Sequence, residues 1–276
     1  MIASEWGDWL PQRVAAAQPD GIAVWYLGCN GFILKAADGT TIFIDPYLGS
    51  GDPPRTVRMI PVPFEPEDID RADAILGTHE HTDHVHGPSQ APILARTGGT
   101  LYAPAASLAV TEAEAWPAHL DLTDEQMEAV APGDTLTLGD VTIHVRDAYD
   151  PDAREPVSYV IEHAAGCLFH GGDSKPSEAF QAIGEEFDID VAIVAIGSHG
   201  NLTDPSTGSQ SRTKWYASPD EAIEIANAVR TDRLLPSHWD MWKGFGVDPT
   251  AVYAHASSFP YPRSVEIVEI GDRVDL

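Results

Sequence analysis

The sequence predicts an α/β fold in which two β-sheets lie face to face with helices on both outer faces, a four-layer αββα sandwich. Two observations lead to this prediction. Strands joined by tight turns come first, helical segments follow them, and the same order recurs in the second half of the 276-residue chain. Sheets and helices each bury a face against another layer, so this order favours a layered arrangement. No linker, sequence repeat or low-complexity tract interrupts the chain, and we therefore expect a single domain over residues 1–276.

The first half is expected to contain a helix, a β-meander and two further strand–helix pairs. The polar lead-in over residues 1–20 is interpreted as one helix that ends before Pro19. The Asn-Gly pair in the turn at 28–31 supplies the positive φ that a hairpin turn needs. A Gly- and Pro-rich loop at 45–66 has a length that is uncommon unless the loop covers a site. The predicted strands are 22–27, 32–35, 40–44, 72–76 and 100–103, and the predicted helices are 89–97 and 105–116.

The second half repeats the pattern of hairpins followed by helices. Ser218 precedes one predicted helix and is expected to cap it. The predicted strands are 135–138, 141–145, 158–162, 167–170, 191–196, 234–236 and 265–270, and the predicted helices are 177–187, 219–229 and 249–257.

The charge of the chain limits the partners that it can have. A formal net charge of −27 at pH 7 repels nucleic-acid phosphates, so a DNA or RNA substrate is disfavoured and a small molecule is favoured. Such a surface suits a protein that works in high salt, where repulsion between its own charges is screened. A merely acidic, well-solvated surface explains the charge equally well.

The sequence carries no signal for export or for membrane insertion. The first six residues lack the basic and apolar regions of a signal peptide, and no apolar run reaches the length of a membrane span. Cys29 and Cys167 are the only cysteines and form no Cys-x-x-Cys pair, so neither a disulfide framework nor a zinc ribbon is indicated. We expect a cytoplasmic protein with no membrane partner.

A histidine-rich segment, THEHTDH at residues 78–84, follows the predicted strand at 72–76. In extended backbone His79 and His81 project to the same side, so they can bind one metal ion. Asp83 and His84 point away from that pair and suit a second ion close by. Imidazole and carboxylate groups bind Zn²⁺, Mn²⁺ or Fe, without the thiolates of a structural zinc site. A solvated, histidine-rich turn is the alternative, since a short motif can be a false match when its structural context is missing.

Further candidate ligands follow strands downstream. Asp173 comes after a strand and two glycines, where it can bridge two ions, or it caps the next helix. His238 follows the strand at 234–236 and suits the second ion, although a single histidine is often a packing residue. The strand at 141–145 leads to Asp150 and to the less favoured Asp147.

These stretches together resemble the metallo-β-lactamase-fold hydrolases, and within them the L-ascorbate-6-phosphate lactonase branch. The resemblance runs from about residue 21 to residue 249 and rests on residues 25–31, 78–84, 147–150, 172–174, 197–200 and 236–242. It implies two divalent metal ions and a ligand set shared between them. The first ion would be bound by His79, His81 and Asp150, and the second by Asp83, His84 and His238, with Asp173 between them.

The residue type at position 150, which follows the strand at 141–145, influences which metal is bound. Many members of the superfamily have histidine where this chain has Asp150, and the lactonase branch resembles this chain there. The additional carboxylate shifts preference toward Mn²⁺, with Zn²⁺ still open. His144 is the rival ligand, but it alternates with Val141, Ile143 and Val145 and should therefore face away from their side of the strand.

The resemblance implies a metal-dependent hydrolase that opens a lactone or ester of a sugar-acid-like small molecule. A hydroxide bridging the ions would attack the carbonyl, with Asp83 as the catalytic residue that orients it or accepts its proton. The candidate substrate contacts are His199, Lys214 and Trp239. The alternative for His199 is a structural role in a turn, for Lys214 a solvated surface position, and for Trp239 packing in the core. A small-molecule phosphodiesterase and a non-catalytic metal-binding scaffold are the competing functions. The family resemblance also allows a homo-oligomer.

Overall fold

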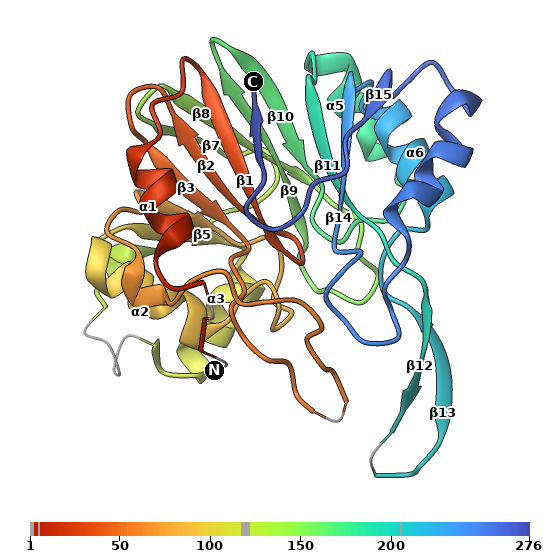
Figure 1. Cartoon of the computed structure of the whole chain (residues 1–276), viewed down its shortest axis with the longest axis horizontal. Helices are drawn as coiled ribbons and strands as arrows, with labels where there is room; N and C mark the ends of the chain where they lie inside the picture. Colours follow the sequence, from red (N-terminus) through yellow and green to blue (C-terminus); the bar gives the residue numbers. More distant parts are fainter. Residues whose placement is uncertain (1–2, 5, 54, 117–121, 205) are drawn as a thin grey trace.

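The computed structural model describes residues 3–4, 6–53, 55–116, 122–204 and 206–276. Two seven-stranded sheets form its centre, and helices cover the outer face of each (Figure 1). The predicted four-layer α/β sandwich is therefore confirmed. Part of the expected lead-in, residues 1–2 and 5, lies outside the described residues.

The first sheet has the strand order β16-β1-β2-β3-β4-β5-β6. Its strands are antiparallel from β16 to β3 and parallel from β3 to β6. The strands are β1 (Ile22–Gly28), β2 (Gly31–Ala36), β3 (Thr41–Ile44), β4 (Ala74–Leu76), β5 (Thr100–Ala103), β6 (Met127–Ala129) and β16 (Arg273–Asp275).

The second sheet repeats this plan with the strand order β15-β14-β11-β10-β9-β8-β7. The strands from β7 to β10 are antiparallel, and those from β10 to β15 are parallel. The strands are β7 (Thr135–Leu138), β8 (Val141–Asp147), β9 (Val157–His163), β10 (Gly166–His170), β11 (Val191–Ala195), β14 (Arg233–Ser237) and β15 (Ser264–Val265).

Side-chain alternation along the strands divides the interior into layers. On β1, Val24 and Tyr26 pack between the sheets, whereas Trp25 and Leu27 pack against the helices of the first half. These opposite directions follow from the two-residue repeat of a strand. A third apolar cluster joins the second sheet to its helices. The helices are α1 (Trp9–Ala16), α2 (Gly87–Thr97) and α3 (Ala105–Ala113) on the first side, and α5 (Ala179–Glu186) and α6 (Pro219–Ala228) on the second.

Short 3₁₀ helices complete the covering layers at η1 (Pro66–Asp68), η2 (Asp124–Gln126), η3 (Pro249–Ala254) and η4 (Ala256–Ser258). The cap predicted at Ser218 is present as a capping box with Glu221. None of the helices in the described ranges has the length and apolar character that a membrane crossing requires.

Two predicted elements near the C-terminus were wrong. The expected helix at 249–257 is a pair of 3₁₀ segments, η3 and η4, in a stretch where Val252 and Tyr253 are weak helix formers. The expected strand at 265–270 stops at Val265. After that residue the chain passes from the edge of the second sheet to the edge of the first, where β16 pairs with β1, and residues 266–270 belong to no strand.

The strands β12 (His199–Thr203) and β13 (Gln210–Lys214) form an antiparallel hairpin that was not predicted. The hairpin projects away from the two sheets (Figure 1). Its sequences, HGNLT and QSRTK, lack the apolar alternation that reveals a half-buried strand. It therefore forms an arm outside the core rather than a further layer of it.

Candidate metal centre

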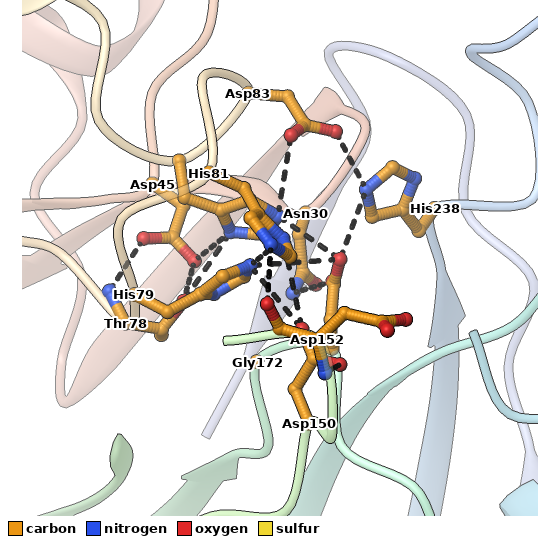
Figure 2. A network of polar contacts seen from close by, with 12 residues as sticks. Asn30, Asp45, Thr78, His79, His81, Asp83, Asp150, Asp152, Gly172 and His238 are labelled. Atoms are coloured by element: carbon orange, nitrogen blue, oxygen red, sulfur yellow. Dashed lines mark hydrogen bonds and ion pairs between the residues drawn. The ribbon is translucent and has the colours of Figure 1, made fainter. Parts of the chain in front are cut away.

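The candidate metal centre lies where strands of both sheets end. The segment 78–84 follows β4, Asp150 follows β8, Asp173 follows β10, and His238 follows β14. Figure 2 shows labelled side chains from these segments pointing toward one another. Strand ends from both sheets therefore deliver histidine and aspartate side chains to one place.

The first donor set consists of His79, His81 and Asp150. His79 Nε2 lies 2.9 Å from His81 Nδ1, and Asp150 Oδ2 lies 3.7 Å from His79 Nε2 and 3.6 Å from His81 Nδ1. One nitrogen or oxygen of each residue falls within 4.8 Å of the other two, a spacing that one ion can satisfy. His79 and Asp150 are buried, and the side chain of His81 is 36% exposed.

The second donor set consists of Asp83, His84 and His238. His238 Nε2 lies 3.3 Å from Asp83 Oδ2, and His84 Nε2 lies 3.9 Å from Asp83 Oδ1. Both histidine side chains are completely buried, and that of Asp83 is 16% exposed. The second set is therefore more enclosed than the first.

Asp173 connects the two sets through one oxygen atom. Its Oδ2 lies 3.2 Å from His84 Nε2, 3.7 Å from His238 Nε2 and 3.9 Å from His79 Nε2. Gly172 places it there with a φ of +58°, a left-handed conformation that glycine adopts without strain. A side chain at Gly172 would also contact Thr78 at 3.2 Å. The paired glycines thus let the carboxylate approach both sets.

A carboxylate beneath the second set fixes the ring of His84. Asp45 Oδ2 lies 2.7 Å from His84 Nδ1 and accepts a hydrogen bond from Thr78 Oγ1 at 2.7 Å. The backbone nitrogen of Thr78 donates to Asp45 Oδ1 at 2.8 Å (Figure 2). A carboxylate on one ring nitrogen leaves the other free to bind a metal ion.

Asn30 holds the shared carboxylate from the β1–β2 turn. Its Nδ2 donates to Asp173 Oδ1 at 3.3 Å, and its Oδ1 accepts from Ser237 Oγ at 2.7 Å. His170 Nε2 lies 3.1 Å from the carbonyl oxygen of Asn30. His170 thus supports the site through Asn30, behind the donor sets.

Aromatic side chains pack against the second donor set. Trp242 Nε1 donates to Asp83 Oδ2 at 3.0 Å. The ring of Tyr216 stacks on His238, with ring centroids 3.9 Å apart. These contacts restrict the orientations of Asp83 and His238.

The match to a known family decides the identity of the fold. The family described as "Beta-lactamase superfamily domain" matches residues 40–239, a range that contains both donor sets, Asp45 and Asp173. The chain belongs to this superfamily. Its two-sheet architecture and its His/Asp cluster, which is able to bind metal, agree with that assignment.

A relative with sequence similarity carries an activity in its name. The "Probable L-ascorbate-6-phosphate lactonase" of Escherichia fergusonii is 26% identical over 292 residues, which cover 90% of this chain and 78% of that protein. The resemblance to that branch of the superfamily is thus present along most of the chain.

Solved structures of two hydrolases share the fold. The metallo hydrolase Igni18 of the archaeon Ignicoccus hospitalis aligns with a TM-score of 0.68 at 19% identity, over 92% of this chain and 98% of that chain. An isothiocyanate hydrolase from Delia radicum gut bacteria aligns with a TM-score of 0.69 at 14% identity, over 92% of this chain and 98% of the other. These likenesses establish the metallo-β-lactamase fold and not a substrate.

Negative charge dominates the centre of this superfamily member. Burial acts to lower the pKa of His84 and of His238, but nearby carboxylates, Asp173 first among them, outweigh burial and raise both values. Burial and the charge of Asp173 raise the pKa of Asp150. The carboxylates that raise the pKa of His84 and of His238 in this way also attract cations.

The rival ligands lie outside the cluster. Asp147 is exposed at the end of β8. His144 Nε2 lies 2.7 Å from Glu162 Oε2, and its ring packs near Phe187. The strand alternation therefore turns His144 away from the donor sets, as the sequence indicated.

The structure does not bring the predicted substrate contacts into the cluster. His199 is exposed at the start of β12, opposite Lys214 in the hairpin register. Lys214 is paired with Glu221. Trp239 lines a separate cavity of about 710 Å³ together with Trp6 and Ile60. Their contact with substrate stays a prediction.

Sequence reasoning missed several residues that support the donors. Asp45 follows β3 as Asp173 follows β10, so its place after a strand was the signal that could have revealed it. Asn30 and Cys29 lie in the stretch 25–31, which the sequence marked as a hairpin turn and as part of the family resemblance but not as a support for the donors. For Trp242, no sequence pattern marked the indole as a partner of Asp83.

Proposed function

We propose that this chain is a hydrolase that binds two divalent metal ions and opens a lactone or related ester of a sugar-acid-like molecule. The observation that carries the proposal is the position of Asp173, whose Oδ2 lies within 3.9 Å of histidine nitrogens in both donor sets. A carboxylate shared in this way suits a pair of ions held close together. The first ion would be held by His79, His81 and Asp150, and the second by Asp83, His84 and His238.

The chemistry of the donors fits two divalent ions. The carboxylates of Asp83, Asp150 and Asp173 carry more negative charge than one divalent ion neutralises. Neutral imidazoles with carboxylates bind Zn²⁺ and also suit Mn²⁺. Divalent ions bound there would supply a nucleophile at neutral pH and polarise the carbonyl of the substrate.

Asp83 is the proposed catalytic residue of this chain. Burial acts to raise its pKa, but the charges of His84 and His238 hold that pKa well below its usual value, so the carboxylate is ionised. The indole of Trp242 fixes Oδ2 of Asp83. With partial exposure, the carboxylate can orient the attacking water and accept a hydrogen bond from it.

We infer that a substrate reaches the donors from the side of His81, whose side chain is partly exposed. Lys175 lies on that side, with Nζ 3.6 Å from Asp150 Oδ1 and 3.9 Å from Asp152 Oδ2. The lactone class is supported by the name of the similar relative, and His199, Lys214 and Trp239 remain the proposed contacts. We further propose a single domain that acts on small molecules in the cytoplasm.

The test compares metal-stripped protein with protein reloaded with Mn²⁺ or Zn²⁺. Each preparation is assayed on sugar lactones, simple esters and small phosphodiesters. Metal-dependent opening of a lactone or ester supports the proposal. Turnover confined to phosphodiesters would favour the phosphodiesterase instead, and a metal-bound protein inert toward all three classes would favour a scaffold.

A further inference from the structure

Cys29 places its sulfur atom against the second donor set. The residue is fully buried in the turn between β1 and β2. Its Sγ lies 3.2 Å from His238 Nε2 and 3.7 Å from Asp83 Oδ2, and those two atoms are 3.3 Å apart. Sulfur, nitrogen and oxygen therefore form a small triangle.

The size of this triangle matches one face of a tetrahedral metal site. Zinc binds sulfur at about 2.3 Å and nitrogen or oxygen at about 2.0–2.2 Å, which separates tetrahedral ligand atoms by roughly 3.3–3.6 Å. The observed separations of 3.2, 3.3 and 3.7 Å lie close to that range. One ion can thus contact Cys29, Asp83 and His238 with small adjustments.

The backbone holds the sulfur and the imidazole together. Cys29 has a φ of +60° and His238 a φ of +63°, a left-handed conformation that side-chain-bearing residues rarely adopt. The nitrogen of His238 donates to the carbonyl oxygen of Cys29 at 2.6 Å, and the nitrogen of Cys29 donates to Asp240 Oδ1 at 3.2 Å. Unfavourable backbone conformations that persist in this way cluster at functional sites.

The second cysteine shows what a packing cysteine looks like in this fold. Cys167 lies on β10 in the apolar cluster with Phe169 and Phe180. Among the described residues it belongs to no group of side chains that could hold a metal ion, whereas Cys29 does. Cys167 is therefore the matched control for Cys29.

We propose that Cys29 is a thiolate ligand of the ion bound by the second donor set. The proposal rests on the metal-dependent function proposed above and adds a ligand to it. As the metal–sulfur bond forms, the thiol proton is released to solvent. A soft thiolate favours Zn²⁺ or Co²⁺ over Mn²⁺, while the first donor set has only imidazole and carboxylate ligands. The two positions consequently differ in metal preference.

The spectroscopic test uses the Co²⁺-loaded full chain. Wild-type and Cys167→Ser proteins should show a near-ultraviolet sulfur-to-cobalt charge-transfer band, and Cys29→Ser should lack it. Cys29→Gly is the second variant, because glycine adopts the φ of this position without strain. X-ray absorption of the Zn²⁺-loaded Cys167→Ser protein should show sulfur at about 2.3 Å. That measurement does not depend on the folding of a Cys29 variant.

A competition experiment reads the metal preference directly. With Zn²⁺ and excess Mn²⁺ present, the wild type should retain Zn²⁺ at one position. In Cys29→Ser, the affinity for Zn²⁺ relative to that for Mn²⁺ should fall by at least ~10–100-fold. A loss of that size follows even when a metal ligand loses only its outer hydrogen-bond partner. Unchanged selectivity in a folded variant would overturn the proposal.

The outcomes separate this proposal from the proposed function. A protein that binds two ions and hydrolyses an ester, with only nitrogen and oxygen around the metal, would exclude Cys29 and leave the function standing. A charge-transfer band without hydrolysis would establish the thiolate ligand and count against the hydrolase. A wild type that binds no divalent ion would overturn both.

Discussion

The two donor sets of the candidate metal centre differ in their access to solvent. In the first set, the side chain of His81 is 36% exposed, and its Nε2 lies 3.3 Å from the carbonyl oxygen of Asp152 in a surface turn. In the second set, His84 and His238 are completely buried. The first set therefore lies nearer the solvent, and the second lies deeper.

The sets also differ in what holds their side chains. Asp45 fixes His84, the indole of Trp242 fixes Asp83, and Tyr216 stacks on His238. In the first set, Thr78 Oγ1 lies 3.0 Å from His79 Nδ1, but His81 and Asp150 are contacted by the backbone of Asp152, an exposed residue of a turn, at 3.3 and 3.1 Å. Ligands that are held in place lose less conformational freedom on binding, so we expect a tightly bound ion in the second set and an exchangeable ion in the first.

The largest effect is expected for Asp173→Asn, because its carboxylate contacts both sets. The substitution preserves size but removes the charge, and both ions should be lost together. Turnover should fall by more than the ~10²–10⁴-fold attributed to a general base alone. Elemental analysis and turnover on one preparation check this. Full occupancy at either position would mean that the two sets bind independently of Asp173.

Asp83→Asn tests whether the deeper set performs chemistry as well as binding. The amide cannot accept the proton of an attacking water and binds the second ion more weakly, so hydrolysis of any accepted lactone should fall by about 10²–10⁴-fold. Circular dichroism should remain that of the wild type, since the residue follows β4 and is not part of the core. Wild-type turnover in folded Asp83→Asn would refute the mechanism proposed here.

How much of this centre was predictable depended on where its residues lie in the sequence. The segment 78–84 could be found because four donors lie within a few residues after a strand. Asp173 and His238 were predicted by the same rule at separate strand ends. Asp45 was missed because Asp-Pro resembles a turn, and its role depends on a buried contact to His84, 39 positions away.

The layers of the fold were more predictable than its edges. Alternation in β1 assigns Val24 and Trp25 to opposite faces, and the structure places them in different apolar clusters. The hairpin of β12 and β13 has no such pattern, because its side chains are mostly exposed and polar. The structure of the C-terminus also depends on pairing between residues far apart in the sequence, because β16 forms its strand against β1.

Two single substitutions compare metal binding by the two sets directly. Their effect is expected to be smaller than that of the aspartate substitutions above. His81→Ala should lose the first ion and keep the second, whereas His238→Ala should preferentially lose the second. Each variant should approach one ion per chain by elemental analysis after dialysis. During chelator treatment of the wild type, the first ion should leave faster. If His238→Ala retained both ions, His238 would be removed from the site.

The smallest effect is expected for Asp45→Asn, which tests the support of the deeper set without removing a proposed ligand. Asp45 Oδ2 lies 2.7 Å from His84 Nδ1 and thereby fixes which nitrogen faces the donors. An amide can present a donor to that ring instead, so metal affinity or activity should fall by about 10–100-fold. The matched control is Asp147→Asn, an exposed strand-end aspartate that should behave as the wild type. Titration with Zn²⁺ should show the loss at the second position alone; equal weakening at both positions would mean that Asp45 stabilises the whole centre rather than the deeper set.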